Sequence, residues 1–320
     1  MLTPSYVIPD LETEQRVQFV KQYFGAALRH ALQLHTVFAP LFVLQHTGIN
    51  DDLNGNEAPV TFRRGGNEYA IVHSLAKWKR MRLKELCVPM YEGIVTHMLA
   101  LRPDEAVSEI HSVLVDQWDW EMVIGKADRN LFFLQSVVRK IYRRIRQAEL
   151  AVRQAYPEIQ ATLPEKITFI HAEELQERYP DKTPREREDL AVKEYGAVFL
   201  TGIGSMLADG RPHDGRAADY DDWSTPTYPG YKGLNGDILL WHPVLQRSFE
   251  VSSMGIRVDK EALLRQLEIC GAGSRSELAF HRLVLNDDLP FTIGGGIGQS
   301  RMAMFLLKQP HIGMVQYCYP

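Results

Sequence analysis

The chain has 320 residues, of which 45% are hydrophobic and 24% are charged. This balance is typical of a globular protein and excludes a disordered, collagenous or coiled-coil chain. With 36 lysines and arginines against 40 aspartates and glutamates, the net charge is −4, which argues against a dedicated nucleic-acid binder.

The start of the chain and its cysteines favour a cytoplasmic location. The sequence turns acidic by residue 10 without an apolar signal-peptide core, and no run of about 18 apolar residues could span a membrane. The three cysteines, Cys87, Cys270 and Cys318, form no CxxC pair, which fits a reducing compartment and no zinc site. We therefore expect a cytoplasmic protein with no membrane partner.

The first predicted element is an amphipathic helix over residues 12–34. Its apolar residues recur at helical spacing: Val17, Val20, Phe24, Leu28 and Leu32. The next stretch, 34–44, is β-branched and aromatic but contains Pro40, which cannot donate to a sheet ladder. We expect a strand that lies at a sheet edge or has a break.

Strand-like and helical patterns follow one another irregularly through the rest of the chain. Strands are predicted at residues 68–73, 111–120, 167–171, 197–203, 237–243 and 248–253. Helices are predicted at 74–86, 131–153, 184–195, 259–270, 276–285 and 300–308. Because the order is not a strict βαβ alternation, we expect an α+β fold with a large, mainly antiparallel sheet flanked by helices. No repeat or linker divides the chain, so residues 1–320 are expected to form a single domain.

The helix predicted over 131–153 carries a basic face. Its polar residues are Arg139, Lys140, Arg143, Arg144 and Arg146. They could bind RNA, or they could be the solvated face of a helix that packs on the core. The acidic overall balance favours the second interpretation, so no nucleic-acid partner is expected.

Residues 208–236 form a long stretch without periodicity, rich in glycine, proline and aspartate. A loop of this length inside a compact domain is usually functional or disordered. Its aromatic residues, Tyr220, Trp223, Tyr228 and Tyr231, argue against disorder. We therefore expect an active-site loop.

A glycine cluster lies near the end of the chain. Residues 292–307 predict a short strand, then Gly294, Gly295, Gly296 and Gly298, then an apolar helix that opens with Arg301. The glycines could let a ligand approach the backbone, or could only permit a tight turn. No phosphate-loop, dinucleotide, HExxH or GxSxG motif is present, so the common nucleotide and hydrolase folds are unsupported.

Three segments together are similar to the three motifs of class II aminoacyl-tRNA synthetases. They are the proline-containing junction at 37–42, Arg102 with its neighbours Asp104 and Glu105, and the glycine cluster with Arg301. Longer stretches resemble the ammonia-dependent asparagine synthetase family, the aspartate–ammonia ligases: 72–80, 96–105, 111–121, 216–226, 233–241, 249–259 and 292–301. The resemblance runs from about residue 11 almost to the C-terminus.

This resemblance implies a class II synthetase-like catalytic domain without an anticodon-binding domain, as a homodimer. The implied reaction converts aspartate, ATP and ammonia into asparagine, AMP and pyrophosphate through β-aspartyl-AMP. No glutaminase module is visible, so free ammonia is the expected nitrogen donor. Two alternatives stay open: an amino-acid-activating enzyme that acts on tRNA or a protein, and a catalytically silent paralogue. The lack of a basic surplus argues against the first, and the retained charged residues discussed next argue against the second.

The chemistry needs no protein nucleophile, so the enzyme must orient its substrates and stabilise phosphate charge. Asp237 and Glu250 are the expected Mg²⁺ ligands, because carboxylate oxygens suit a hard cation. Arg102 is expected to hold the α-phosphate together with the reacting carboxylate. Arg301 should pair with the phosphates or stack on adenine. Each could instead be an ordinary surface charge.

The strand that contains residues 116–121 has two distinct faces. Alternation places Gln117 and Asp119 on one surface and Trp118 and Trp120 on the other. We expect the polar pair to bind aspartate. The resemblance adds nucleotide contacts at Ser112, Val115 and Gly296.

The resemblance further implies that the amino-acid substrate is held by Asp51, Ser74, Lys79, Asp221 and Ser253. Asp51 or Asp221 would bind its ammonium or accept a proton from ammonia, and Lys79 would neutralise its carboxylate. Lys77 and Arg80 are rivals for the last role, because such a basic stretch is often a solvated helix face.

Strand parity places Glu250 and Ser253 on opposite faces. Both can reach the site only if their strand bulges or ends between them.

Overall fold

The computed structural model describes residues 9–50, 57–228 and 230–317. Helix α1 (Leu11–Leu32) begins at Asp10, whose carboxylate accepts a hydrogen bond from the Thr13 backbone nitrogen at 2.8 Å. Its predicted apolar stripe is buried, so the first predicted element is confirmed.

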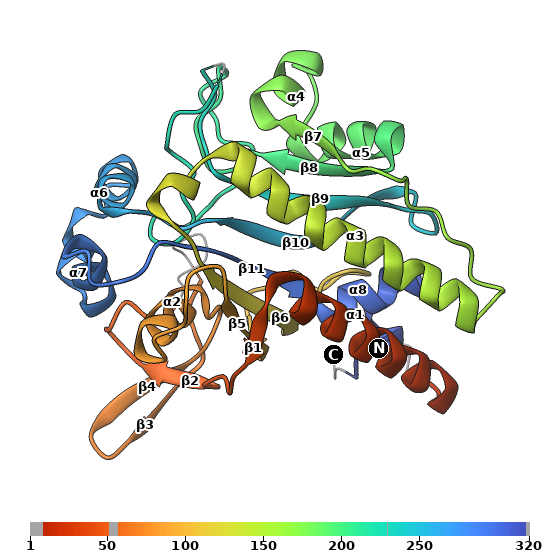
Figure 1. Ribbon diagram of the computed structural model, residues 1–320, viewed down its shortest axis with the longest axis horizontal. Coiled ribbons are helices and arrows are strands. Elements are labelled where there is room, and N and C mark those ends of the chain that lie inside the picture. The colour runs from red at the N-terminus through yellow and green to blue at the C-terminus, as the bar shows by residue number, and fades with distance from the viewer. Residues whose placement is uncertain (1–8, 51–56, 229, 318–320) are drawn as a thin grey trace, which may run out of the picture.

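The segment after α1 is broken at Pro40, as predicted. Strand β1 (Leu34–Thr36) pairs in parallel with β5 (Gly93–Leu101), whereas β2 (Phe42–Leu44) pairs with β4 (Asn67–Ile71) in another sheet. Strand β3 (Thr61–Arg64) completes that three-stranded sheet, which lies below the main body in Figure 1. The two halves of one apolar stretch therefore belong to different sheets.

The main sheet has eight strands in the order β1-β5-β6-β11-β10-β9-β8-β7. The remaining strands are β6 (Leu114–Val123), β7 (Thr168–His171), β8 (Ala197–Thr201), β9 (Asn235–His242), β10 (Arg247–Ile256) and β11 (Thr292–Gly298). The pairs β1–β5 and β7–β8 at the two ends are parallel, and the pairs between them are antiparallel. The mainly antiparallel sheet is thus confirmed.

The glycine cluster differs from the prediction. Gly294, Gly295, Gly296 and Gly298 are not in a turn after a short strand; they lie within β11, which pairs with β6 on one side and β10 on the other. Helix α8 (Gln299–Leu306) then begins directly, with Arg301 in its first turn.

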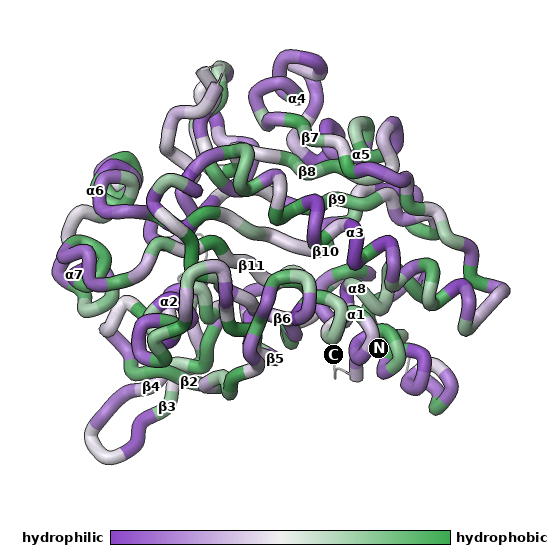
Figure 2. The backbone as a smooth tube through the Cα atoms, viewed as in Figure 1, coloured by the Kyte–Doolittle hydropathy of each residue, from purple (hydrophilic) through white to green (hydrophobic). Residues whose placement is uncertain are grey.

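One face of the sheet is covered by α1, α3 (Leu131–Ala155) and α8, which contact one another (Figure 1). The largest hydrophobic core lies between these helices and the sheet, and includes Phe24, Trp118 and Phe305. Hydrophilic and hydrophobic residues alternate along α3 in Figure 2, as an amphipathic helix requires.

The opposite face is covered only at its sides. Helix α2 (Ala76–Glu85) packs on β5, β6 and β11, while α4 (Ala172–Arg178) contacts β7, and α5 (Pro184–Tyr195) contacts β8, β9 and β10. Helices α6 (Lys260–Ile269) and α7 (Ala279–Leu285) share a smaller core at one end. The middle of this face, between α2 and α5, lies under the loop that follows β8.

Several boundaries differ from the prediction. Strands β3 and β5 and helix α4 were not predicted as elements, and short 3₁₀ turns occur at Lys126–Asp128, Gly273–Glu277 and Ile312–Met314. The helix predicted from residue 276 begins at Ala279, and the irregular loop ends at Leu234, since β9 already contains residues 235 and 236. Among the described residues, no helix is long and apolar enough to cross a membrane.

Candidate active site

A cavity of about 330 Å³ opens over the middle of the sheet, on the face opposite α1, α3 and α8. The predicted site residues that line it are Ser74, Arg102, Ser112, Val115, Gln117, Asp119, Asp221, Glu250, Ser253, Gly296 and Arg301. Residues 214–217 and Tyr220 of the irregular loop also line it, as expected of an active-site loop. Asp51 lies outside the described residues, and Lys79 and Asp237 lie behind the cavity wall.

The floor of the cavity follows a single row of cross-strand neighbours. Asp119 of β6 pairs with Gly296 of β11, Gly296 with Ser253 of β10, and Ser253 with Asp237 of β9. Directly paired residues point to the same face of a sheet. Four segments that are distant in sequence therefore contribute to one surface.

The predicted two faces of β6 are present. Gln117 and Asp119 line the cavity, whereas the Trp118 ring lies 4.9 Å from the Phe24 ring of α1, centroid to centroid. Ser112 and Val115 also line the cavity, although β6 begins at Leu114, so Ser112 precedes the strand.

A bulge in β10 resolves the parity conflict between Glu250 and Ser253. The pairing register with β9 shifts between Glu250 and Ser252, and both Glu250 and Ser253 line the cavity. One extra residue changes the face on which later side chains emerge. The predicted bulge is therefore present.

Five buried charged residues form what we call the charged floor: Lys79, Asp119, Glu121, Asp221 and Arg257. The Lys79 ammonium donates to the Asp119 carboxylate and, at 2.9 Å, to the Trp120 carbonyl, and lies 3.7 Å from Glu121. Arg257 holds Glu121 at 2.7 Å and also donates to Asp221. Two cations and three carboxylates leave one net negative charge if all are ionised.

Burial acts strongly on the acid–base balance of the charged floor. It lowers the pKa of Lys79 and raises the pKa of Asp119 and Asp221, against the opposing effect of their ion-pair partners. Burial also opposes ionisation of Glu121, but Arg257 and Lys79 together lower its pKa. An additional cation would therefore be favoured beside Asp119 and Asp221.

Three glycines leave room for the charged floor and its neighbours. A Cβ atom on Gly294 would collide with Glu121, one on Gly296 would collide with Gln117, and one on Gly255 would lie 2.8 Å from Asp221. Gly294 and Gly296 are alternate residues of β11, so they share a face. The glycines of β11 thus permit close packing of polar side chains and, at Gly296, line the cavity.

The rivals of Lys79 are buried as well, so the solvated-face interpretation of the basic stretch is wrong. The Lys77 ammonium lies 3.1 Å from Asp219, and Arg80 donates to the backbone carbonyls of Val258 and Pro290. Of Lys77, Lys79 and Arg80, Lys79 is the one that contacts Asp119, whose carboxylate lines the cavity. Its own ammonium is behind Asp119.

Asp219 is a junction that contacts two cations and a histidine. Besides Lys77, the Arg275 guanidinium lies 2.7 Å and the His281 imidazole 3.0 Å from its Oδ2 atom. Asp219 belongs to the irregular loop, two residues before Asp221. The junction therefore fixes this part of the loop to α2 and α7.

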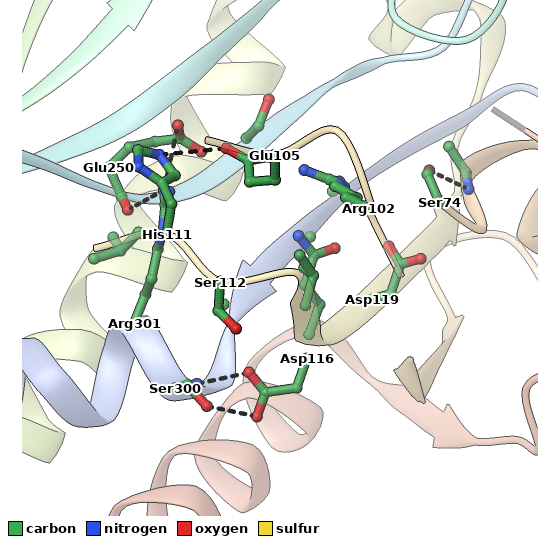
Figure 3. A pocket seen from close by; sticks show the side chains of 18 of the residues that line it. Ser74, Arg102, Glu105, His111, Ser112, Asp116, Asp119, Glu250, Ser300 and Arg301 are labelled. Atoms are coloured by element: carbon green, nitrogen blue, oxygen red, sulfur yellow. Dashed lines mark hydrogen bonds and ion pairs between the residues drawn. The ribbon is translucent and has the colours of Figure 1, made fainter. Parts of the chain in front are cut away.

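Figure 3 shows Arg102 between Ser74 and Asp119 on one side and Glu105, His111 and Glu250 on the other. Arg102 donates to the His73 carbonyl at 3.3 Å, and its buried Nε atom has no hydrogen-bond partner in the described part of the chain. Such a guanidinium can still receive an anionic ligand.

Arg301 lies beside Glu250, at the end of the cavity that also contains His111. Its guanidinium donates to the Glu250 carbonyl at 3.1 Å and lies 3.6 Å from the Glu250 carboxylate. Burial, followed by the positive charge of Arg301, lowers the pKa of His111 to about 4. His111 is therefore neutral at pH 7.

The two carboxylates expected to bind Mg²⁺ lie on neighbouring strands, β9 and β10. The Oδ1 atom of Asp237 is buried without a hydrogen-bond partner among the described residues, while its Oδ2 atom accepts a hydrogen bond from Arg216 at 2.5 Å. No group of three or more His, Cys, Asp or Glu side chains in the described ranges could hold a metal alone. Two carboxylates do fit Mg²⁺, which is commonly bound by one or two carboxylates with substrate phosphates and water.

Arg216 and Arg257 were not among the predicted site residues. Arg257 could have been found, because the alternation that continues from Ser253 through Gly255 places it on the cavity face. Arg216 lies in a loop without periodicity, so no pattern distinguishes it. We call Arg102, Arg216, Asp237, Glu250 and Arg301 the phosphate end of the cavity, after the ligand that the family resemblance implies for Arg102 and Arg301.

The chain is similar in sequence to proteins named aspartate–ammonia ligase. The sequence model of a family described as aspartate-ammonia ligase matches residues 11–319. A relative in Parabacteroides distasonis, named aspartate–ammonia ligase, is 53% identical over 308 residues, which cover 95% of this chain and 89% of the relative. A relative of the same name in Bacteroides fragilis is 52% identical with the same coverage.

Solved synthetase structures have a similar fold. Asparaginyl-tRNA synthetase from Pyrococcus horikoshii, complexed with asparaginyl-adenylate, has a TM-score of 0.71 at 15% identity and covers 95% of this chain and 68% of that chain. The Entamoeba histolytica enzyme with asparaginyl-adenylate has a TM-score of 0.66 at 12% identity, covering 95% and 65%. The predicted class II synthetase-like catalytic fold is confirmed.

Proposed function

The chain belongs to the aspartate–ammonia ligase family, and on that premise we propose that it joins aspartate to ammonia through an aspartyl adenylate made from ATP. It is an enzyme, a ligase, and its product is asparagine. The adenylate, ATP, Mg²⁺ and the residue roles below are the proposal.

The observation that carries the proposal is the position of Arg102. Its partly unpaired guanidinium lies between Asp119 of the charged floor and Glu250 of the phosphate end (Figure 3). A carboxylate and an α-phosphate must meet for an adenylate to form, and a planar guanidinium can contact both. The position of Arg102 supports a meeting of the two groups beside its guanidinium.

The reaction then has two steps. A β-carboxylate oxygen of aspartate attacks the α-phosphorus of ATP, an O–P bond forms, and the bond to pyrophosphate breaks. The ammonia nitrogen next attacks the acyl carbon, the bond to AMP breaks, and the nitrogen loses a proton. Arg102 would stabilise the charge that develops on phosphate in the first step.

The charged floor suits the ammonium group of aspartate. Asp119 and Asp221 line the cavity, and the surplus of one carboxylate favours a cation beside them. Gln117, Ser74 and Ser253 lie within reach of the same ligand, because they line the same cavity. Lys79 would act by holding Asp119 rather than by touching the substrate. For Asp51, only the family resemblance supports a role, which is to bind the substrate ammonium or to accept a proton from ammonia.

The phosphate end suits a nucleotide with a divalent cation. Arg301 would pair with phosphate or stack on adenine, while Ser112, Val115 and Gly296 would border the nucleotide. Asp237 and Glu250 would hold Mg²⁺, which when bound would neutralise phosphate charge. The buried, unpartnered Oδ1 atom of Asp237 supports this assignment.

The test is to mix the protein with aspartate, ATP, Mg²⁺ and an ammonium salt, and to assay asparagine, AMP and ADP together. Asparagine and AMP should appear in equal amounts. ADP in place of AMP would contradict the adenylate. Aspartate-dependent pyrophosphate exchange without asparagine would instead indicate a tRNA or protein acceptor.

We also propose a homodimer of single-domain, cytoplasmic subunits with no nucleic-acid partner. The dimer is supported by helix α1 and the segment that contains Pro40, which are similar to the dimer-forming motif of class II synthetases, and the lack of a nucleic-acid partner is supported by the net charge of −4. Light scattering should give twice the 36.6 kDa chain mass; a monomer would contradict the dimer.

A further inference from the structure

A guanidinium from the irregular loop sits on the carboxylate assigned to the metal. One Arg216 nitrogen donates to Asp237 at 2.5 Å, and the other donates to the Asp214 carboxylate and the Gly215 carbonyl, each at 2.8 Å. Only 13% of the Arg216 side chain and 8% of the Asp237 side chain are exposed. Asp237 consequently does not line the cavity, whereas Arg216 does.

The backbone that carries Arg216 is firmly placed. The Trp223 indole donates to the Ala217 carbonyl at 3.0 Å, and Gly204 packs so closely that a Cβ there would lie 2.9 Å from the Arg216 Cβ. Asp219, three residues further along, is held by Lys77, Arg275 and His281. A change of partner by Arg216 would therefore be a motion of its side chain, with the loop in place.

Arg216 has a second set of potential partners within the same cavity. A guanidinium fork matches phosphate oxygens as well as carboxylate oxygens. A divalent cation and the Arg216 guanidinium are both positively charged, and Asp237 would have to hold both. Two such charges on one carboxylate repel each other strongly where burial limits screening. The nucleotide would bring both the metal and the phosphates.

We propose that Arg216 occupies Asp237 in the ligand-free enzyme, competes there with the divalent cation, and transfers to a phosphate of the incoming metal–nucleotide complex. The proposal rests on the assignment of the phosphate end made above. Its consequence is that Asp237 binds metal tightly only when a nucleotide is present to receive Arg216.

The probe is Mn²⁺, whose free form is measured by electron paramagnetic resonance, added to protein without nucleotide, aspartate or ammonium. Arg216→Gln should bind Mn²⁺ at least about tenfold more tightly than the wild type, because it frees the carboxylate and removes a positive charge. Arg211→Gln, an exposed arginine on the same loop, is the matched control and should leave the dissociation constant unchanged.

Two further variants test whether the gain in Mn²⁺ affinity comes from freeing the Asp237 carboxylate. Arg216→Met keeps the aliphatic stem that packs beside Gly204, so this variant should fold even if Arg216→Gln fails to fold. It should show the same gain in Mn²⁺ affinity. Adding Asp237→Asn to either variant should abolish the gain. An unchanged or weaker Mn²⁺ affinity in folded Arg216→Gln or Arg216→Met would overturn the proposal, as would a gain that survives Asp237→Asn.

The measurement is separate from the asparagine assay. Tighter Mn²⁺ binding by the variants in a protein that makes no asparagine would refute the proposed function and leave the competition standing. Asparagine synthesis without any effect on Mn²⁺ binding would refute the competition alone.

Discussion

The charged floor and the phosphate end occupy the same cavity but are built differently. In the charged floor each cation is held by carboxylates, Arg257 contacts both Glu121 and Asp221, and one atom, Asp119 Oδ2, is buried without a hydrogen-bond partner among the described residues. At the phosphate end, the Nε atoms of Arg102 and Arg216 and the Oδ1 atom of Asp237 are buried without hydrogen-bond partners in the described part of the chain. Glu250 is 42% exposed.

The difference separates what is preorganised from what the ligand completes. A paired, buried network holds its geometry before substrate arrives, which suits recognition of a small amino acid. Unpaired buried donors and acceptors carry a desolvation cost that the proposed binding of phosphate and metal would recover. Mutations should therefore affect folding at the charged floor and ligand-dependent steps at the phosphate end.

The largest effect is expected for Lys79→Met. Asp119 and Glu121 would lose a buried counter-charge, so the free energy of unfolding should fall by about 3–5 kcal/mol. Urea denaturation measures the change. Lys84→Met, which removes a half-exposed lysine from the same helix, should cost at most about 0.5 kcal/mol. Equal losses in the two variants would mean that the charged floor is not a stabilising network.

Arg102→Ala should lower the turnover rate at least about a hundredfold, since it removes the guanidinium proposed to stabilise the transferring phosphoryl group. Its stability should change little, because the Arg102 side chain donates only one long hydrogen bond that the structure records, to His73. Steady-state kinetics and thermal unfolding test the two statements together. Arg282→Ala, at an exposed arginine, is the control, and near-normal turnover by Arg102→Ala would refute its role.

Glu250→Gln should raise the Mg²⁺ concentration needed for half-maximal activity by about tenfold or more, because an amide is a weaker ligand for a hard cation. A Mg²⁺ titration of activity gives the value. Glu105→Gln changes another carboxylate that lines the same cavity and should leave the titration nearly unchanged. If both variants shift it equally, the effect reflects general cavity charge rather than metal ligation.

The smallest effect is expected for His111, whose pKa burial and Arg301 lower to about 4. The unfolded chain takes up this proton near pH 6.5, whereas the folded protein does so only near pH 4, so stability is lost as pH falls through that window. Because the side chain is 28% exposed, we expect His111→Gln to reduce the loss between pH 6.5 and 5 by at most about 1 kcal/mol. Urea midpoints at the two pH values test this, and identical slopes would contradict it.

Apart from α4, the helices could be predicted, as could the separate faces of β6, because their apolar residues recur with a simple period. The bulge in β10 was predictable only as a condition, from the need for Glu250 and Ser253 to share a site. The burial of Lys77, Lys79 and Arg80 was not, because their carboxylate and carbonyl partners come from segments far away in the chain.

The glycine cluster shows the same limit. Composition predicts a turn, since glycine is a weak strand former. The residues form a strand because Glu121 and Gln117, on the neighbouring strand, fill the space that side chains of Gly294 and Gly296 would take. No sequence pattern marks Arg216. Its position depends on the hydrogen bonds made by Trp223 and Asp237 rather than on its neighbours in sequence.

The position of β11 in the sheet has a consequence for how the chain folds during its synthesis. This strand is the last of the main sheet in sequence order, yet it lies between β6 and β10 near the middle of the sheet. A nascent chain that ends before Thr292 exposes one edge of β6 and one edge of β10, each able to pair with another polypeptide. The cavity floor is therefore assembled only after β11 has been synthesised, and the open edges of β6 and β10 need protection until then.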